Sequence, residues 1–243
     1  MKLYAELADW YPLLTPLHEY EEESADYIAA FSAALGDAPY RLLELGAGAG
    51  HNAHYLAPYT SELALVDLAP EMLKIAGRSC PNASLHVGDM RSVRLNRSFD
   101  AVFVHDAICY MLTEDDLLAV FETARAHLRP GGVLLIAPDY VTETFEPTEE
   151  VGGHDGEGRA LRYLGWVWQR PGETDRYVVD YVIATRVGDA PPVIHQDRHV
   201  EGVFPRDTWR RLLHQAGFSL EALPRVNPDD DRPLELLLAR LVG

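Results

Sequence analysis

The sequence contains little basic charge. Lys2 and Lys74 are its only lysines, and 21 basic residues stand against 38 acidic ones, for a formal net charge of −17. Proteins that bind nucleic acid neutralise its phosphates with clustered lysines and arginines, whereas the arginines here are scattered along the chain. The charge balance therefore argues against a nucleic-acid partner. It favours a neutral or cationic small molecule, because an acidic protein repels anions.

Cysteines and long apolar runs are also scarce. Cys80 and Cys109 show neither a metal-ligand spacing nor a CxxC motif, which fits free thiols in a reducing compartment. His195 and His199 lack a convincing third ligand, so we expect no metal site. No apolar run is long enough to cross a bilayer, and the acidic start "MKLYAELADWY" is not typical of a signal peptide. We therefore expect a cytoplasmic protein that does not contact a membrane.

The chain has the composition of one globular α/β domain, with 47% hydrophobic residues in a length of 243. Residues 1–36 are expected to form a helical cap. In residues 37–138 short apolar strands alternate with helices, a pattern that predicts a doubly wound parallel sheet. Residues 139–203 contain consecutive strands separated by Gly, Pro and Asp turns, which predicts an antiparallel β insert. Residues 204–243 are expected to close the domain with a helix and strands.

A glycine-rich turn follows the first expected strand, in "LLELGAGAGHN" (residues 42–52). Its glycines stand at positions 46, 48 and 50, and His51 occupies the place where the dinucleotide-binding motif G-x-G-x-x-G needs its third glycine. A dinucleotide is therefore disfavoured, because that small residue lets helix and strand pack closely beside the pyrophosphate. Glycines let the backbone approach a ligand closely, although a tight turn without a ligand gives the same pattern.

The motifs after this turn are more specific. "LVDLAPEML", "GDM", "FDAVFVHDAICYM" and "LRPGGVLLI" follow "ELGAGAG" in this order, and together they resemble the S-adenosylmethionine-dependent methyltransferases of the Rossmann-like class. The resemblance covers residues 40–138 and extends through "WRRLLHQAGF" towards the end of the chain. It implies a mostly parallel seven-stranded sheet with an antiparallel last strand, S-adenosylmethionine as the cofactor, and a small-molecule methyl acceptor over which the insert lies.

The resemblance also implies which residues hold the cofactor. Asp67, at the end of the second strand, would accept hydrogen bonds from both ribose hydroxyls, and Asp89 would accept from the adenine amino group. Glu44 would lie near the ammonium of the methionine moiety, unless it only satisfies nearby turn amides. The other candidates belong to the glycine turn, the adenine surroundings and the N-terminal lead-in: Gly46, Ala47, Gly48, Gly50, Leu68, Met72, Gly88, Met90, Tyr4 and Tyr11. Leu68 and Met72 are equally typical of a core, and Tyr4 and Tyr11 of a helix cap.

The end of the fourth expected strand, "VHDAICYM", is the candidate acceptor site. His105, Asp106 and Tyr110 follow the buried run "AVFV" and would face the methyl group. His105 or Tyr110 would be a substrate-facing polar group or a base, since histidine is the commonest proton-transfer side chain, and Asp106 would orient an amine or hydroxyl. The alternative is that His105 only packs against the cofactor through its backbone.

Aromatic residues recur in the expected insert, at Tyr163, Trp166, Trp168, Tyr177 and Tyr181. In the subset of the resembled family that acts on sugar-linked amines, an insert after the fifth strand roofs the acceptor pocket and can form dimer contacts. The resemblance therefore implies the same roof here and allows a homodimer. Alternating aromatics are also typical of the packed face of a sheet.

These patterns leave three functions, of which a small-molecule methyltransferase is favoured. It would be N- or O-directed and would work by in-line displacement at the methyl carbon. A non-catalytic cofactor-binding or regulatory module is the alternative, because a fold does not fix a function. A dehydrogenase is disfavoured by His51 and by the absence of a second nucleotide-binding half.

Overall fold

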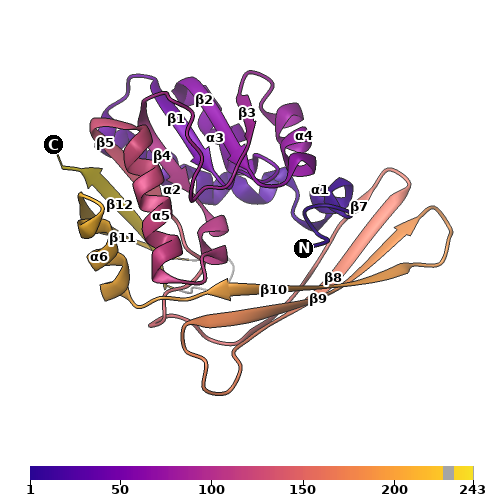
Figure 1. Ribbon diagram of the computed structural model, residues 1–243. Helices are drawn as coiled ribbons and strands as arrows, with labels where there is room; N and C mark the ends of the chain where they lie inside the picture. Colours follow the sequence, from indigo (N-terminus) through magenta and orange to yellow (C-terminus); the bar gives the residue numbers. More distant parts are fainter. Residues whose placement is uncertain (227–232, 243) are drawn as a thin grey trace.

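The computed structural model describes residues 1–226 and 233–242, which contain two β-sheets (Figure 1). The larger, sheet A, has seven strands in the order β11-β12-β5-β4-β1-β2-β3. Its strands are β1 (Tyr40–Leu45), β2 (Thr60–Asp67), β3 (Ser84–Val87), β4 (Phe99–Val104), β5 (Leu128–Ile136), β11 (Phe218–Val226) and β12 (Pro233–Leu241). The first five pair in parallel, and β12 pairs antiparallel with β5 and β11. The predicted doubly wound, mostly parallel sheet is therefore confirmed.

Helices cover both faces of sheet A, because its central strands bury alternate side chains on opposite sides. The helices are α2 (Glu21–Leu35), α3 (His51–Leu56), α4 (Pro70–Ser79), α5 (Glu114–His127) and α6 (Arg206–Gln215). On β1, Leu42 packs with α2, α3 and α4, whereas its neighbour Leu43 packs with α5 and α6. The core therefore consists of two apolar layers separated by the sheet.

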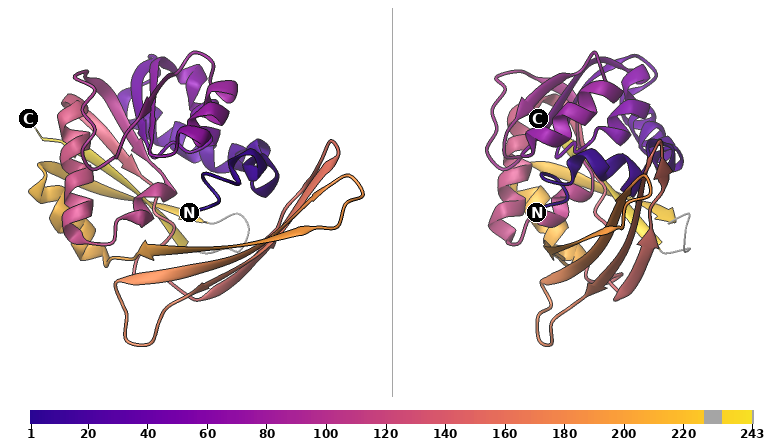
Figure 2. Two further views of the ribbon diagram at one scale, coloured as in Figure 1. Left: turned by 45° about the vertical axis from the view of Figure 1, so that its right-hand side comes forward. Right: turned by 90° about the vertical axis from the view of Figure 1, so that its right-hand side faces the viewer.

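The insert forms sheet B, in the order β10-β9-β8-β6, so the antiparallel β insert is confirmed as well. Its strands are β6 (Thr148–Gly152), β7 (Asp155–Gly156), β8 (Arg159–Trp168), β9 (Arg176–Val187) and β10 (Val193–Gly202). Each pairing is antiparallel, and β7 pairs with β8. Figure 2 shows sheet B as a long twisted sheet that passes along one side of the main domain and extends beyond it.

The N-terminal segment lies between the main domain and sheet B (Figure 1). It consists of the 3-10 helices η1 (Ala8–Trp10) and η2 (Leu17–Tyr20) with α1 (Tyr11–Leu14) between them. Leu3, Leu7 and Leu14 pack against Leu161 and Ile183 of sheet B. The segment thereby ties the insert to the rest of the protein. Within residues 1–226 and 233–242, no helix is both long and apolar enough to cross a membrane.

Candidate active site

A cleft of about 1650 Å³ lies where the carboxyl ends of β1, β2 and β4 face sheet B. In the sheet, β1 lies between β2 and β4, so the order of the strands reverses at β1. Ligands of doubly wound sheets bind at such a switch point. Every cofactor or acceptor residue proposed from the sequence lines this cleft except Gly50. A Cβ on Gly50 would lie 2.9 Å from the Cβ of Ala76, so this glycine lets the turn pack against α4.

The glycine-rich turn is fixed to β2 by backbone hydrogen bonds. The amides of Gly46 and Ala47 donate to the Val66 carbonyl, at 2.8 and 3.0 Å. Gly46 has a φ of +75°, and a Cβ there would clash with Ala107, which lies beyond the end of β4. Glycine at position 46 is therefore required by a close approach within the protein, and not only by room for a ligand as the sequence suggested.

Asp67 ends β2 in the cleft, and two backbone amides hold its carboxylate. Oδ2 accepts from the Gly48 amide and Oδ1 from the Ala69 amide, both at 2.8 Å. Burial raises the pKa of Asp67 above its usual value, although these amides oppose the rise. A carboxylate has about four lone-pair positions, so it can still accept from ligand hydroxyls beside these amides and that of Leu68. This geometry suits the ribose contact that the sequence implies.

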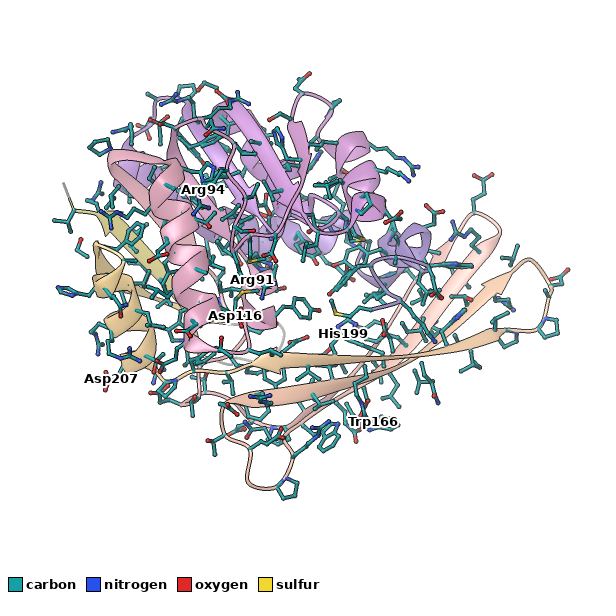
Figure 3. The ribbon with its side chains drawn as sticks, in the orientation of Figure 1. Arg91, Arg94, Asp116, Trp166, His199 and Asp207 are labelled. Carbon is teal, nitrogen blue, oxygen red and sulfur yellow. The ribbon has the colours of Figure 1, made fainter. Side chains whose placement is uncertain are left out.

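Asp89 is held by an arginine that the sequence motifs did not single out. Arg91 Nη2 donates to Asp89 Oδ2 at 2.6 Å, and Arg91 Nη1 donates to Asp116 at 2.7 Å. Figure 3 shows Arg91 and Asp116 next to each other near the start of α5. Hydrogen bonds from Arg91 lower the pKa of Asp89, so its carboxylate is anionic. An adenine amino group would therefore share this carboxylate with Arg91.

The apolar candidates near this end differ in exposure. Leu68 is 64% exposed, whereas Met72 and Met90 are 0% and 8% exposed and belong to the core. Gly88 lies against Val93, whose Cγ2 would be 3.0 Å from an added Cβ. Leu68 is thus free to cover a flat ring, while the two methionines are held in the core and line the cleft.

Two buried polar atoms beside the glycine turn, Glu44 Oε2 and His51 Nδ1, have no hydrogen-bond partner among the described residues. Burial raises the pKa of Glu44 to about 8 and lowers that of His51 to about 4. A buried polar group without a partner costs about 1–3 kcal/mol, which a ligand can recover. An ammonium group would give Glu44 both a donor and an opposite charge. The amino-acid moiety of S-adenosylmethionine therefore fits this position.

His105 follows β4 and lies between two carboxylates. Its Nε2 is 3.3 Å from Glu23 Oε1 on α2, and its Nδ1 is 3.1 Å from Asp106 Oδ1. Burial opposes a charge on the imidazole, but Asp106 and Glu23 outweigh it and raise the pKa of His105 to about 10. His105 is therefore an imidazolium at neutral pH. This disfavours the role of base that the sequence suggested and favours an electrostatic role.

Acidic side chains gather on the acceptor side of the cleft. Asp106 shares a hydrogen bond with Asp139, and burial together with this second carboxylate raises the pKa of Asp106 well above its usual value. Ligand atoms of Cys109, Asp139 and Glu201 lie within 4.8 Å of one another, close enough to hold one metal ion. Burial and Asp139 raise the pKa of Glu201 to about 7. A cationic amine would supply the charge that this cluster lacks.

The hydroxyl of Tyr110 connects three parts of the protein. It lies 2.8 Å from the Tyr4 hydroxyl of the N-terminal segment and 2.9 Å from His199 Nδ1 on β10. His199 Nε2 lies 3.2 Å from Asp197 Oδ2. His199 is 1% exposed, and Figure 3 shows it on the side of sheet B that faces the main domain. Tyr4 and Tyr110 therefore meet over the cleft, each on a different segment.

The aromatic residues of the insert divide between the two faces of sheet B. Tyr163, Tyr177 and Tyr181 line the cleft, whereas Trp166 and Trp168 are not among the described residues that line it. Trp166 is 41% exposed and lies on the side of the sheet away from the main domain (Figure 3). One face of the insert thus roofs the cleft with tyrosines.

Sequence reasoning missed Arg91, Asp139, His199 and Glu201 as site residues, and it considered His199 only as a metal ligand. A usable signal was present in β10, where "DRHVE" spaces Asp197, His199 and Glu201 two residues apart. Because side chains alternate along a strand, these three lie on one face. Polar residues at this period, in a segment expected to cover the acceptor, indicate a functional face.

Comparison with known proteins agrees with this geometry. Residues 42–132 match a family described as a methyltransferase domain. The chain is 31% identical over 207 residues to dTDP-3-amino-3,6-dideoxy-alpha-D-glucopyranose N,N-dimethyltransferase of Streptomyces fradiae, covering 85% of this chain and 80% of that protein.

Solved structures show the same fold over nearly the whole chain. DesVI of Streptomyces venezuelae superposes with a TM-score of 0.83 at 24% identity, over 97% of this chain and 98% of that one. CalS10 with bound S-adenosylmethionine, an amino pentose methyltransferase from Micromonospora echinaspora, superposes with a TM-score of 0.74 at 26% identity, over 91% of both chains.

The relationship supports an enzyme and not a non-catalytic module, because the similarity extends over the insert and the acceptor side as well as the cofactor-binding core. The glycine turn, Asp67 and the unpartnered Glu44 Oε2 suit the S-adenosylmethionine that is bound in CalS10. The chain belongs to the family of S-adenosylmethionine-dependent methyltransferases.

Proposed function

We propose that this enzyme transfers the methyl group of S-adenosylmethionine to the amino group of a sugar. The observation that carries the proposal is the carboxylate cluster of Asp106, Asp139 and Glu201 on the acceptor side of the cleft. Such a cluster attracts a protonated amine and gives no comparable advantage to a hydroxyl. The relatives named above are an amino-sugar N,N-dimethyltransferase and an amino pentose methyltransferase, which supports the same acceptor class here.

The residues would divide the work between binding and positioning. S-adenosylmethionine, when bound, supplies a methyl group activated by its positively charged sulfur. Asp67 would hold the ribose and Glu44 the ammonium of the cofactor, while the glycine turn provides the close backbone approach. The remaining cofactor contacts we propose are Tyr4, Tyr11, Gly46, Ala47, Gly48, Leu68, Met72, Gly88, Asp89, Met90 and His105, and Gly50 would act only by letting the turn pack against α4.

On the acceptor side, Asp106 would orient the amine, and the charged His105 would fix Asp106 in place. Their side chains lie 3.1 Å apart, and both residues line the cleft. Holding two reactants about 3–3.5 Å apart in the right direction supplies much of the acceleration of a displacement at carbon. Tyr110 would contact the amine from the opposite side, next to Tyr4.

The test uses S-adenosylmethionine labelled with 13C in its methyl group. The purified protein is incubated with amino sugars, free and dTDP-linked, and with counterparts in which a hydroxyl replaces the amine. We expect a 13C signal of an N-methyl group with an amino sugar and no transfer to the hydroxyl counterparts. Transfer to a hydroxyl counterpart, or binding of the cofactor without transfer to any amine, would contradict the proposal.

A variant pair locates the acceptor site. Asp106→Asn removes the charge that orients the amine, so the KM for the amine should rise at least about tenfold, the effect of losing one charge-assisted contact worth about 1.5 kcal/mol or more. The affinity for S-adenosylmethionine should change little. Asp207→Asn, on the outer side of α6 (Figure 3), is the matched control and should leave both values unchanged.

A further inference from the structure

A series of hydrogen bonds leads from the cleft to buried polar residues on β10 of sheet B. The Tyr4 hydroxyl lies 2.8 Å from that of Tyr110, which lies 2.9 Å from His199 Nδ1, and His199 Nε2 lies 3.2 Å from Asp197 Oδ2. Tyr4 and Tyr110 line the cleft, whereas His199 is 1% exposed behind them. We propose that these hydrogen bonds form a proton relay. Tyr110 takes a proton from the methyl acceptor and passes its own hydroxyl proton to His199.

The hydrogen-bond partners of His199 determine which of its ring nitrogens carries the hydrogen. Asp197 also accepts from the Leu3 amide at 2.8 Å, and its interactions with Leu3 and His199 outweigh burial and lower its pKa, so it is an anionic acceptor. His199 Nε2 must then carry the hydrogen that faces Asp197. Its Nδ1 is left as an acceptor for the Tyr110 hydroxyl. Tyr110 can therefore give its proton to His199 Nδ1, and its oxygen can then accept one from the cleft.

The step balances without another reactant. An N–H bond of the acceptor breaks and its proton bonds to the Tyr110 oxygen, while the original Tyr110 proton bonds to His199 Nδ1. The freed electron pair on nitrogen forms the bond to the methyl carbon, and the electrons of the methyl–sulfur bond stay with the sulfur. His199 becomes an imidazolium between Asp197 at 3.2 Å and Glu201 at 3.8 Å. The Asp197 carboxylate stabilises that charge, and Glu201 adds to it when it is ionised.

The protonation state of His199 depends on the charged and titratable groups that face its ring. The groups that face it are Asp197 and Glu201 on β10, Tyr181 on β9, Tyr110 after β4, and Tyr4 with the Met1 amino group from the N-terminal segment. Burial lowers the pKa of His199 below its usual 6.5, although Asp197 opposes the shift. The ring is therefore neutral at pH 7 and available as an acceptor. His199 acts through Tyr110 and is a positioning and proton-accepting residue rather than one that touches the substrate.

The inference rests on the proposed function only in that the acceptor must lose a proton. His199→Asn tests it, because the amide oxygen can still accept from Tyr110 but cannot bind a proton. We expect kcat at saturating amino sugar to fall about 10²- to 10⁴-fold, the usual contribution of proton transfer. The acid limb of the kcat profile that His199 causes below pH 6.5 should also disappear. His195→Asn is the matched control on the same strand, since His195 contacts Thr185 at 3.0 Å and should leave kcat unchanged.

A readout that does not depend on turnover is the 15N NMR signal of His199. Native protein at pH 7 should show an unprotonated Nδ1 and a protonated Nε2, with both nitrogens protonated only below pH 6.5. Protonated Nδ1 at pH 7, or a His199→Asn enzyme with native kcat and pH profile, would overturn the relay. If the native enzyme methylates no amine while His199 shows the expected tautomer, the proposed function fails and the hydrogen-bond geometry stands.

Discussion

Glu44 should make the stability of the ligand-free protein fall as the pH rises. The residue is 2% exposed, and burial raises the pKa of its carboxyl from 4.5 to about 8. Between these values the folded protein retains a proton that the unfolded chain has lost, so the free energy of unfolding decreases by about 1.4 kcal/mol per pH unit. Over the whole interval this amounts to about 5 kcal/mol. Glu44→Gln cannot ionise and should lose this slope.

The assay is urea denaturation at several pH values from 5 to 8.5, with native protein and variant compared at each. Other buried acids also titrate in this range, so the quantity to follow is the difference between the two proteins. The variant should gain stability relative to native protein steadily up to about pH 8. Glu122→Gln, exposed on α5, is the matched control and should give a curve parallel to that of native protein. A Glu44→Gln difference that does not change with pH would refute the reasoning.

The same carboxyl couples cofactor binding to proton release. An ammonium group beside Glu44 lowers its pKa, so binding near pH 7 should expel a proton. Calorimetry with S-adenosylhomocysteine in buffers of different ionisation enthalpy measures that proton directly. Glu44→Gln should bind more weakly and release none. Equal proton release from both proteins would show that the ammonium lies elsewhere.

Further predictions concern single contacts. Asp67→Ala should weaken binding of S-adenosylhomocysteine at least about 100-fold by calorimetry, since two charge-assisted hydrogen bonds of about 1.5–3 kcal/mol each are lost; unchanged affinity would contradict the ribose assignment. Gly46→Ala should destabilise the fold by about 2 kcal/mol or more in urea, because left-handed strain adds to the clash with Ala107. Gly131→Ala, equally left-handed but with open space around it, should cost only about 1 kcal/mol, and equal losses would argue against the close approach. Thr113→Ala removes the side-chain cap of α5 and should cost about 1 kcal/mol, seen as a lower Tm; no change would show that the cap is not needed.

The sequence predicts the fold and the cofactor side of the cleft because the signals there are local. Strand, turn and helix follow one another within residues 40–79, so Asp67 and the glycine turn lie close in sequence and meet across neighbouring parallel strands. The turn also shows the limit of such reasoning. The sequence assigns its glycines to the ligand, yet Gly46 is required by Ala107, which is far away in the sequence.

The residues of the acceptor side could not be predicted in the same way, because they come from segments that only the tertiary structure brings together. Tyr4, Tyr110 and His199 belong to the N-terminal segment, the main domain and the insert, and no periodicity predicts that their polar atoms meet. The charge of His105 likewise depends on Glu23, a residue of α2 that no motif marks. Proton-transfer roles assigned from residue type alone therefore change once the neighbouring charges are known.

The most direct test of the account is a crystal structure of the protein with S-adenosylhomocysteine. It should place the ribose on Asp67, the ammonium on Glu44 Oε2, and the sulfur so that a methyl group would point towards Tyr110 and Asp106. Density for the ligand outside the cleft, or a sulfur turned away from Tyr110 with Glu44 still unpaired, would contradict it.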